Sequence, residues 1–175
     1  CSECPKGRSW TSTTLCTVCA DGNYQDLADQ ANVQCKVCPE GYFSFGPLES
    51  AHESCELCPR GFEFTSTSTA CVACNGKVQP ESTTVAASCA FCPGGYKFVS
   101  TIQDCIQCSP GRYQSSNEAA TAQCKICQAG RYTGNVSSAN CDLCPINTYL
   151  DDTGIETSLH LSTRSCVKCA SGKTS

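Results

Sequence analysis

The sequence predicts a small disulfide-rich fold, an elongated tandem array of short β-hairpin and loop repeats with almost no helix. Three observations lead to this prediction: a repeated Cys-x-x-Cys pair, a shortage of large apolar residues, and a glycine at a fixed place after most pairs. The pair occurs ten times and uses all 20 cysteines, at Cys1/Cys4, Cys16/Cys19, Cys35/Cys38, Cys55/Cys58, Cys71/Cys74, Cys89/Cys92, Cys105/Cys108, Cys124/Cys127, Cys141/Cys144 and Cys166/Cys169.

Large apolar residues are too few to build an ordinary core. Leu, Ile, Val and Phe make up 28 of the 175 residues, and a chain below about 20 per cent in these types normally stays disordered. Cysteine makes up 20 of 175 residues, a level typical of disulfide scaffolds. A crosslink that closes a loop of about 15 residues adds roughly 3 kcal/mol by restricting the unfolded chain. We therefore expect disulfides to decide whether the chain folds.

The cysteine content also indicates an extracellular or cell-surface location, because cytosolic reductants keep thiols unpaired. The sequence has no methionine, no signal segment and no apolar run long enough to span a membrane. We therefore expect a stretch of a longer repeat array that does not itself insert into a membrane. A net charge of −4 argues against a nucleic-acid partner, which would require clustered Lys and Arg.

Successive pairs begin 15 to 25 residues apart, a period typical of linear arrays in which neighbours contact neighbours. No Pro-rich or Gly/Ser-rich linker interrupts the chain, so we expect one continuous array without an internal domain boundary. The approximate repeats are 1–15, 16–34, 35–54, 55–70, 71–88, 89–104, 105–123, 124–140, 141–165 and 166–175.

A glycine follows the second cysteine by three residues in eight of the ten pairs. This spacing predicts a tight turn with positive φ, a conformation that glycine adopts without strain. The two exceptions fit the same turn, because Asn147 is of the type that best tolerates it and Gly76 is moved by one position. The eight glycines are Gly7, Gly22, Gly41, Gly61, Gly95, Gly111, Gly130 and Gly172.

Aromatic residues follow most second cysteines by four to six positions, and we expect each ring to lie over its own repeat's disulfide as the main buried surface. The rings are Trp10, Tyr24, Phe43, Phe62, Phe64, Tyr96, Phe98, Tyr113, Tyr132 and Tyr149. Apolar residues between paired cysteines, such as Val37 and Leu143, are interpreted as packing residues. Residues 22–38 and 111–127 share length, a Tyr-Gln start and a Gln-Cys-Lys-x-Cys end, which indicates a longer period of five repeats.

Paired Cys-x-x-Cys motifs at such separations also describe zinc ribbons with four thiolate ligands. Ten similar copies in an acidic chain rich in Ser and Thr favour disulfides instead. A thioredoxin-like redox role requires one reactive pair at the start of a helix, whereas these pairs recur in loops. No metal or cofactor is expected.

Two orderly disulfide schemes use these pairs. In a modular scheme alternate pairs are crosslinked twice, as in Cys1–Cys16 with Cys4–Cys19 and Cys35–Cys55 with Cys38–Cys58. In a ladder the second cysteine of each pair joins the first of the next, which treats every loop alike, as the sequence does, and leaves Cys1 and Cys169 for other partners. The ladder, which we favour, consists of Cys4–Cys16, Cys19–Cys35, Cys38–Cys55, Cys58–Cys71, Cys74–Cys89, Cys92–Cys105, Cys108–Cys124, Cys127–Cys141 and Cys144–Cys166.

Catalysis finds little support in the sequence. His52 and His160 are far apart, and no arrangement of Ser or Asp can be tied to them, so we interpret both as surface residues and assign no catalytic residue. The longest loop, residues 145–165, carries Asp151, Asp152, Glu156 and His160. It lacks the spaced acidic pattern of a calcium-binding loop and is interpreted as solvated.

One modification motif is present. Asn135-Val136-Ser137 is an N-glycosylation sequon, and we expect Asn135 to carry a glycan in a secreted chain. The Ser/Thr-rich runs are compositional candidates for O-glycans.

The unit Cys-x-x-Cys-Pro-x-Gly-x-Tyr/Phe, followed by a polar loop and the next Cys-x-x-Cys, is best displayed by Cys-Lys-Val-Cys-Pro-Glu-Gly-Tyr-Phe at residues 35–43. It resembles the ephrin-receptor-like cysteine-rich repeats of the growth-factor-receptor superfamily and is similar to tumour-necrosis-factor-receptor repeats. The resemblance covers essentially the whole chain. It implies extracellular rods used in receptors, adhesion proteins, matrix proteins and surface coats, and it implies no particular binding residue.

These observations predict a non-enzymatic structural or spacer segment of a large secreted or cell-surface protein, for example a subunit of an extracellular filament or flagellar hair. Its partners would be other proteins or copies of itself. The alternative is a receptor or surface-antigen ectodomain that binds a protein ligand. Repetition favours the structural role, because a specific binding site would usually distinguish one repeat from the others.

Overall fold

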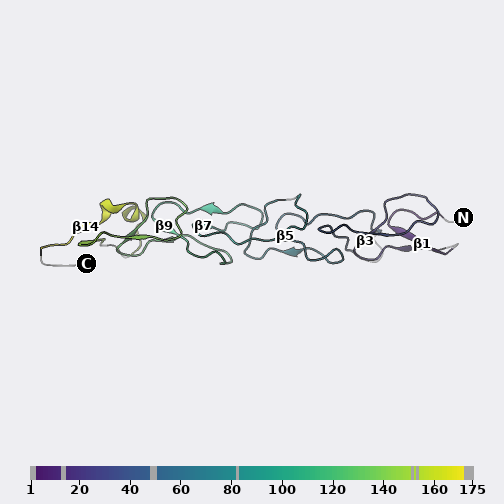
Figure 1. Cartoon of the computed structure of the whole chain (residues 1–175), viewed down its shortest axis with the longest axis horizontal. Coiled ribbons are helices and arrows are strands. Elements are labelled where there is room, and N and C mark those ends of the chain that lie inside the picture. The colour runs from purple at the N-terminus through teal and green to yellow at the C-terminus, as the bar shows by residue number, and fades with distance from the viewer. Residues whose placement is uncertain are drawn as a thin grey trace. The chain divides into compact units, whose positions relative to one another are not determined.

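The computed structural model describes residues 3–12, 15–47, 51–81, 83–150, 152 and 154–171. Short antiparallel two-stranded hairpins follow one another along the chain and are joined by long loops (Figure 1). Seven hairpins lie in the described ranges: β1 (Arg8–Ser12) with β2 (Leu15–Val18), β3 (Asn23–Tyr24) with β4 (Lys36–Val37), β5 (Phe62–Glu63) with β6 (Val72–Ala73), β7 (Tyr96–Lys97) with β8 (Ile106–Gln107), β9 (Arg112–Tyr113) with β10 (Lys125–Ile126), β11 (Arg131–Tyr132) with β12 (Asp142–Leu143), and β13 (Thr148–Tyr149) with β14 (Val167–Lys168).

Helical structure in the described part of the chain consists of two 3-10 segments in the last long loop, η1 (Thr157–His160) and η2 (Thr163–Ser165). Single bridges, Phe43 with Glu56 and Val78 with Ala90, take the place of a strand pair in two repeats. The predicted fold class, a small disulfide-rich array of short hairpins with almost no helix, is confirmed. None of the described helices is long and apolar enough to cross a membrane.

The predicted turn after the cysteine pairs is confirmed wherever the structure describes it. The seven described glycines three after a pair have φ between 73° and 87°, while Gly172 lies outside the described residues. Both exceptions also adopt positive φ, at 64° for Asn147 and 71° for Gly76. In the turn 39–42 the Tyr42 N–H donates to the Pro39 carbonyl at 3.1 Å, as in a turn with glycine at its third position.

The core of each repeat is built on sulfur. The second cysteine of each of the first eight pairs is at most 4% exposed: Cys4, Cys19, Cys38, Cys58, Cys74, Cys92, Cys108 and Cys127. The aromatic rings are only partly buried, and Phe62 and Tyr149 are exposed. The expectation that the rings supply the main buried surface was wrong, because a two-stranded hairpin has no second layer to cover their outer faces.

The residues between paired cysteines form the second strand of most hairpins, and some of them face solvent. Val37 in β4 is 72% exposed and Leu143 in β12 is 65% exposed. The interpretation of these two as packing residues was therefore wrong. Both residues of β4 and both residues of β12 are exposed, because a two-stranded hairpin has no second layer that covers these strands.

The chain divides into two compact units. Unit 1 comprises Cys1–Cys74 with Gln79–Cys89, and unit 2 comprises Asn75–Val78 with Ala90–Ser175. In unit 2 the buried residues Val78, Cys92 and Ala122 form a small apolar cluster against which Tyr96 and Phe98 pack. In unit 1 the buried Val33 accepts a hydrogen bond at its carbonyl from the Trp10 N–H at 2.8 Å.

Candidate functional site

The contact between neighbouring repeats is the feature that recurs in both units. It begins at the turn carbonyl: the Cys38 N–H donates to the Gly22 carbonyl at 2.8 Å. The same bond joins Cys19 to Gly7, Cys74 to Gly61, Cys108 to Gly95, Cys127 to Gly111, Cys144 to Gly130 and Cys169 to Asn147, all at 2.8 to 3.0 Å. Each hairpin is therefore closed by a backbone hydrogen bond onto the second cysteine of the next pair.

The turn N–H points to the following repeat. The Gly22 N–H donates to the Ser44 carbonyl at 2.8 Å. Equivalent bonds run from Gly7 to Gln25, from Gly95 to Gln114 and from Gly111 to Thr133, at 2.7 to 2.8 Å. The turn residue thus uses both of its backbone groups to hold later parts of the chain.

The acceptor in these bonds is a buried polar residue, placed six positions after the second cysteine. Gln25, Ser44, Gln114 and Thr133 are all at most 5% exposed. The Gln25 N–H donates in turn to the His52 carbonyl at 3.0 Å, and the Thr133 N–H to the His160 carbonyl at 2.8 Å. Sequence reasoning missed this position, although a signal exists: in each of these repeats the buried polar residue directly follows an aromatic residue.

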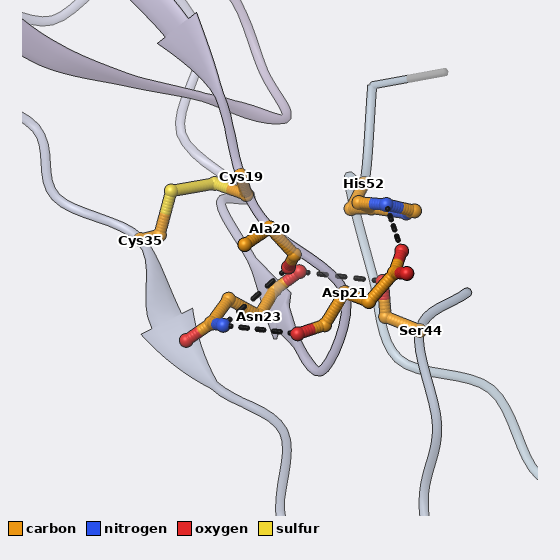
Figure 2. A network of polar contacts seen from close by, with 7 residues as sticks. All are labelled: Cys19, Ala20, Asp21, Asn23, Cys35, Ser44 and His52. Carbon is orange, nitrogen blue, oxygen red and sulfur yellow. Dashed lines mark hydrogen bonds and ion pairs between the residues drawn. A yellow bond between two sulfur atoms is a disulfide. The ribbon is translucent and has the colours of Figure 1, made fainter. Parts of the chain in front are cut away.

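Figure 2 shows one such contact in unit 1, beside the Cys19–Cys35 disulfide. The Asn23 amide donates to the carbonyls of Ala20 and Asp21, at 3.4 and 3.2 Å. The Ser44 hydroxyl donates to the Asn23 carbonyl at 3.3 Å. The His52 ring nitrogen Nε2 lies 3.2 Å from the Asp21 carboxylate. Side chains from two consecutive repeats, 16–34 and 35–54, therefore meet at one turn.

His160 has the corresponding role in unit 2, with a second contact. It is fully buried; its Nδ1 lies 2.6 Å from the Arg131 carbonyl, and its Nε2 contacts the Asp152 carboxylate. Both partners are acceptors, so a ring that is protonated on both nitrogens satisfies both. The interpretation of both histidines as surface residues was wrong, because His52 and His160 are 9% and 0% exposed.

The carboxylate that faces His160 is also shielded, since the Asp152 side chain is 7% exposed. Burial raises the pKa of Asp152, but the hydrogen bond and charge of His160, together with the backbone amides of Gly154 and Ile155, outweigh burial and lower that pKa below its ordinary 3.8. The loop predicted as solvated thus holds a buried contact between His160 and Asp152. Glu156 is exposed, and Asp151 lies outside the described residues.

We next consider clusters of metal-ligating side chains and surface grooves among the described residues. No group of three or more His, Cys, Asp or Glu gathers among them. A groove of about 270 Å³ beside the network of Figure 2 is lined by Phe43, Phe45, His52 and Glu53 among others. It is smaller and more polar than a typical small-molecule pocket.

Among the described residues, nine disulfides link the repeats. Each joins the second cysteine of one pair to the first of the next, from Cys4–Cys16 through to Cys144–Cys166, with Cα–Cα distances of 5.6 to 5.9 Å. Cys169 has a free thiol among the described residues, and Cys1 lies outside them. The disulfides and the backbone bonds therefore run between the same neighbours.

Residues 115–160 match the family model described as tyrosine-protein kinase ephrin type A/B receptor-like. The match supports a receptor-like, cysteine-rich repeat array and covers residues 115–160 of it. The matched segment begins in the loop before Cys124 and ends at His160, so it contains the Cys127–Cys141 disulfide and the contact between Thr133 and His160. No curated protein sequence matches the chain. The receptor-like match and the disulfides together indicate an extracellular segment.

The sequon residue Asn135 lies in this matched segment and in unit 2. It is exposed and precedes the turn at Val136 and Ser137.

Proposed function

We propose that this chain is a non-enzymatic structural segment of an extracellular, receptor-like protein, in which consecutive repeats act as a spacer. One observation supports the proposal above all others: the same set of contacts, a disulfide and two backbone hydrogen bonds from a turn residue, recurs between neighbouring repeats. Contacts that recur in this way stabilise the array as a whole and do not mark any single repeat as a binding site. Stability in such arrays is approximately a sum of nearest-neighbour terms.

The histidines support the absence of catalysis. A general base must reach its substrate's proton, whereas the His160 ring is fully buried and engaged at both nitrogens. His52 is 9% exposed and faces Asp21. Both rings serve the contacts between repeats.

Solution X-ray scattering tests the spacer role. A compact chain of this length has a radius of gyration of about 16 Å, and a linear array of repeats should give a value on the order of twice that. Sedimentation at several concentrations serves as the control, because it separates extension of one chain from association of several. A monomer with a radius near the compact value would contradict the proposal.

A receptor role is the second candidate, and the last long loop favours it. Ile146 and Ile155 are 88% and 74% exposed there, and large exposed apolar side chains are frequent anchors for protein partners. We propose a matched comparison in binding of the labelled protein to the surface of its source cells. The double variant Ile146→Ser with Ile155→Ser is compared with Val37→Ser with Val72→Ser, which also changes exposed apolar residues. Loss of binding in the first pair alone favours the receptor; equal behaviour favours the spacer.

The partners follow from the same reasoning. A structural segment contacts other proteins or copies of itself through its loops, while a receptor contacts one protein ligand. Electron microscopy of the native, non-reduced protein separates these: ordered filaments or sheets support a building block, and isolated particles support the receptor.

A further inference from the structure

Asn135 lies at a solvent-facing turn, and its hydrogen bonds within the described residues involve its backbone and not its side chain. The Asn135 N–H donates to the Thr133 hydroxyl at 3.4 Å, and the Ser138 hydroxyl donates to the Asn135 carbonyl at 3.1 Å. Within the described residues the amide side chain makes no hydrogen bond, and both Asn135 and Val136 are exposed. The amide nitrogen of Asn135 is therefore accessible without any rearrangement of the turn.

The residues that follow point the other way, into the repeat contacts of unit 2. The Ser137 N–H donates to the Cys108 carbonyl at 3.0 Å, and the Gln114 N–H donates to the Ser138 carbonyl at 3.1 Å. Gly95 lies so close that a Cβ added there would sit 2.0 Å from the Ser137 carbonyl oxygen. The turn thus anchors itself through Ser137 and Ser138 while Asn135 projects to solvent, where a bulky group fits.

From the sequon and this geometry we propose that Asn135 carries an N-linked glycan in the mature protein. The donor is a lipid-diphosphate-linked oligosaccharide of the secretory pathway. The Asn135 amide nitrogen forms a bond to the anomeric carbon of the first sugar, the bond from that carbon to the diphosphate oxygen breaks, and the lipid diphosphate leaves. The amide proton passes to the base of the transferase. The glycan keeps this loop of unit 2 solvated and excludes other proteins from it.

The same contacts set the order of events. In the folded repeat Ser137 is held at φ 55°, and its backbone N–H donates to the Cys108 carbonyl at 3.0 Å. The backbone of the residue that completes the sequon is therefore fixed in a turn once the repeat has folded. Transfer takes place on the open chain, before the Cys127–Cys141 disulfide closes around the sequon.

Mass spectrometry of the peptide that contains Asn135, prepared from the secreted native protein, tests the modification. We expect sugar on Asn135 that peptide-N-glycosidase removes, leaving aspartate at that position. Asn135→Gln and Ser137→Ala should each abolish it, whereas Asn140→Gln should not, because Asn140 is exposed in the same loop but lies outside the sequon. An unmodified Asn135 in the secreted protein would overturn the proposal.

The glycosylated fraction of Asn135 tests whether sugar transfer precedes closure of the Cys127–Cys141 disulfide. The double variant Cys127→Ser with Cys141→Ser keeps the loop open, so the glycosylated fraction of Asn135 should rise above that of the wild type or reach completion. Ser137→Thr preserves the sequon and serves as the control. Its glycosylation shows that Asn135 is still modified in a variant that folds poorly. A fraction that falls in the open-loop variant while Ser137→Thr is still modified would show that transfer requires the folded repeat.

Discussion

The residue at the turn after each cysteine pair affects stability through its backbone conformation and through the packing around it. Positive φ is required at each turn, but packing on the turn differs from one repeat to another. At Gly95 a Cβ would sit 2.0 Å from the Ser137 carbonyl oxygen, whereas at Gly130 the described residues leave the same space open. The two glycines have similar φ, 85° and 73°. A comparison of alanine substitutions at the two positions therefore separates the cost of backbone strain from the cost of close packing.

Gly95→Ala should destabilise unit 2 well beyond the cost of Gly130→Ala. Backbone strain alone predicts about 1–2 kcal/mol for Gly130→Ala, and Gly95→Ala must also displace the backbone at Ser137. Equilibrium denaturation of both variants under non-reducing conditions measures the difference. Equal costs would mean that the close approach at Gly95 relaxes freely.

The buried polar position provides a second prediction. Gln114 is 5% exposed, and among the described residues neither polar atom of its side chain has a hydrogen-bond partner. The equivalent residue of the ninth repeat is Leu150, which is also buried. Because an unsatisfied buried amide is costly, Gln114→Leu should raise the free energy of unfolding by roughly 1 kcal/mol.

Gln25→Leu is the matched control, because the Gln25 side-chain oxygen accepts a hydrogen bond from the Leu27 N–H at 2.9 Å. The same substitution there should be neutral or destabilising. Thermal unfolding of both variants measures the change in stability that each substitution causes. A loss of stability in Gln114→Leu would point to an ordered water on that amide.

The buried pair of Asp152 and His160 predicts a dependence on pH. The pKa of Asp152 is lowered in the folded protein, so its contribution to stability is present above the ordinary carboxyl value of 3.8 and is lost as pH falls through the lower folded pKa. Asp152→Asn removes that contribution. The difference in melting temperature between wild type and Asp152→Asn should therefore be largest at neutral pH and shrink in acid.

Asp142→Asn is the control for this titration, since Asp142 is exposed on β12 and should change the melting temperature little at any pH. A difference for Asp152→Asn that stays constant into strong acid would show that the carboxylate charge does not act in this contact.

At the scale of the elements, the hairpins depend on their crosslinks. Strands of two residues are too short to be stable in water, where even longer isolated hairpins are marginal. Each hairpin here is closed by a disulfide such as Cys19–Cys35 and by a backbone bond such as that from Cys38 to Gly22. The pairing of the cysteines is consequently the element-level prediction to test first.

Tryptic digestion without reduction distinguishes the two pairing schemes. Lys36 lies between Cys35 and Cys38, so cleavage after it yields peptides 9–36 and 37–60. In the ladder no disulfide joins these two peptides, and they should separate. In the modular scheme Cys35–Cys55 keeps them together. A disulfide-linked species that contains both peptides and releases them only on reduction would contradict the ladder.

At the scale of the whole molecule, the chain lacks the apolar residues for a core that survives without sulfur. Complete reduction at neutral pH should therefore unfold both units together. Loss of amide chemical-shift dispersion in NMR spectra would show this. Dispersion that persists after every thiol has been alkylated would mean that backbone contacts alone hold the repeats.

The turns, hairpins and disulfide-rich class were predictable because each depends on residues close in sequence. A glycine three after a cysteine pair needs no distant partner to adopt positive φ, and the low apolar content already excludes an ordinary core. The exceptions at Gly76 and Asn147 could be predicted for the same reason.

The repeat, its turn and its dependence on crosslinks therefore follow from the order of residues along the chain. The burial of His52, His160 and the polar residues after the rings, and the exposure of Val37 and Leu143, became visible only in the folded chain. The physical reason is that burial of a residue in this array depends on which groups of the next repeat pack against it. Such contacts join residues more than 20 positions apart, for example Gln25 and His52. The residue types alone do not indicate which distant group lies at a given position.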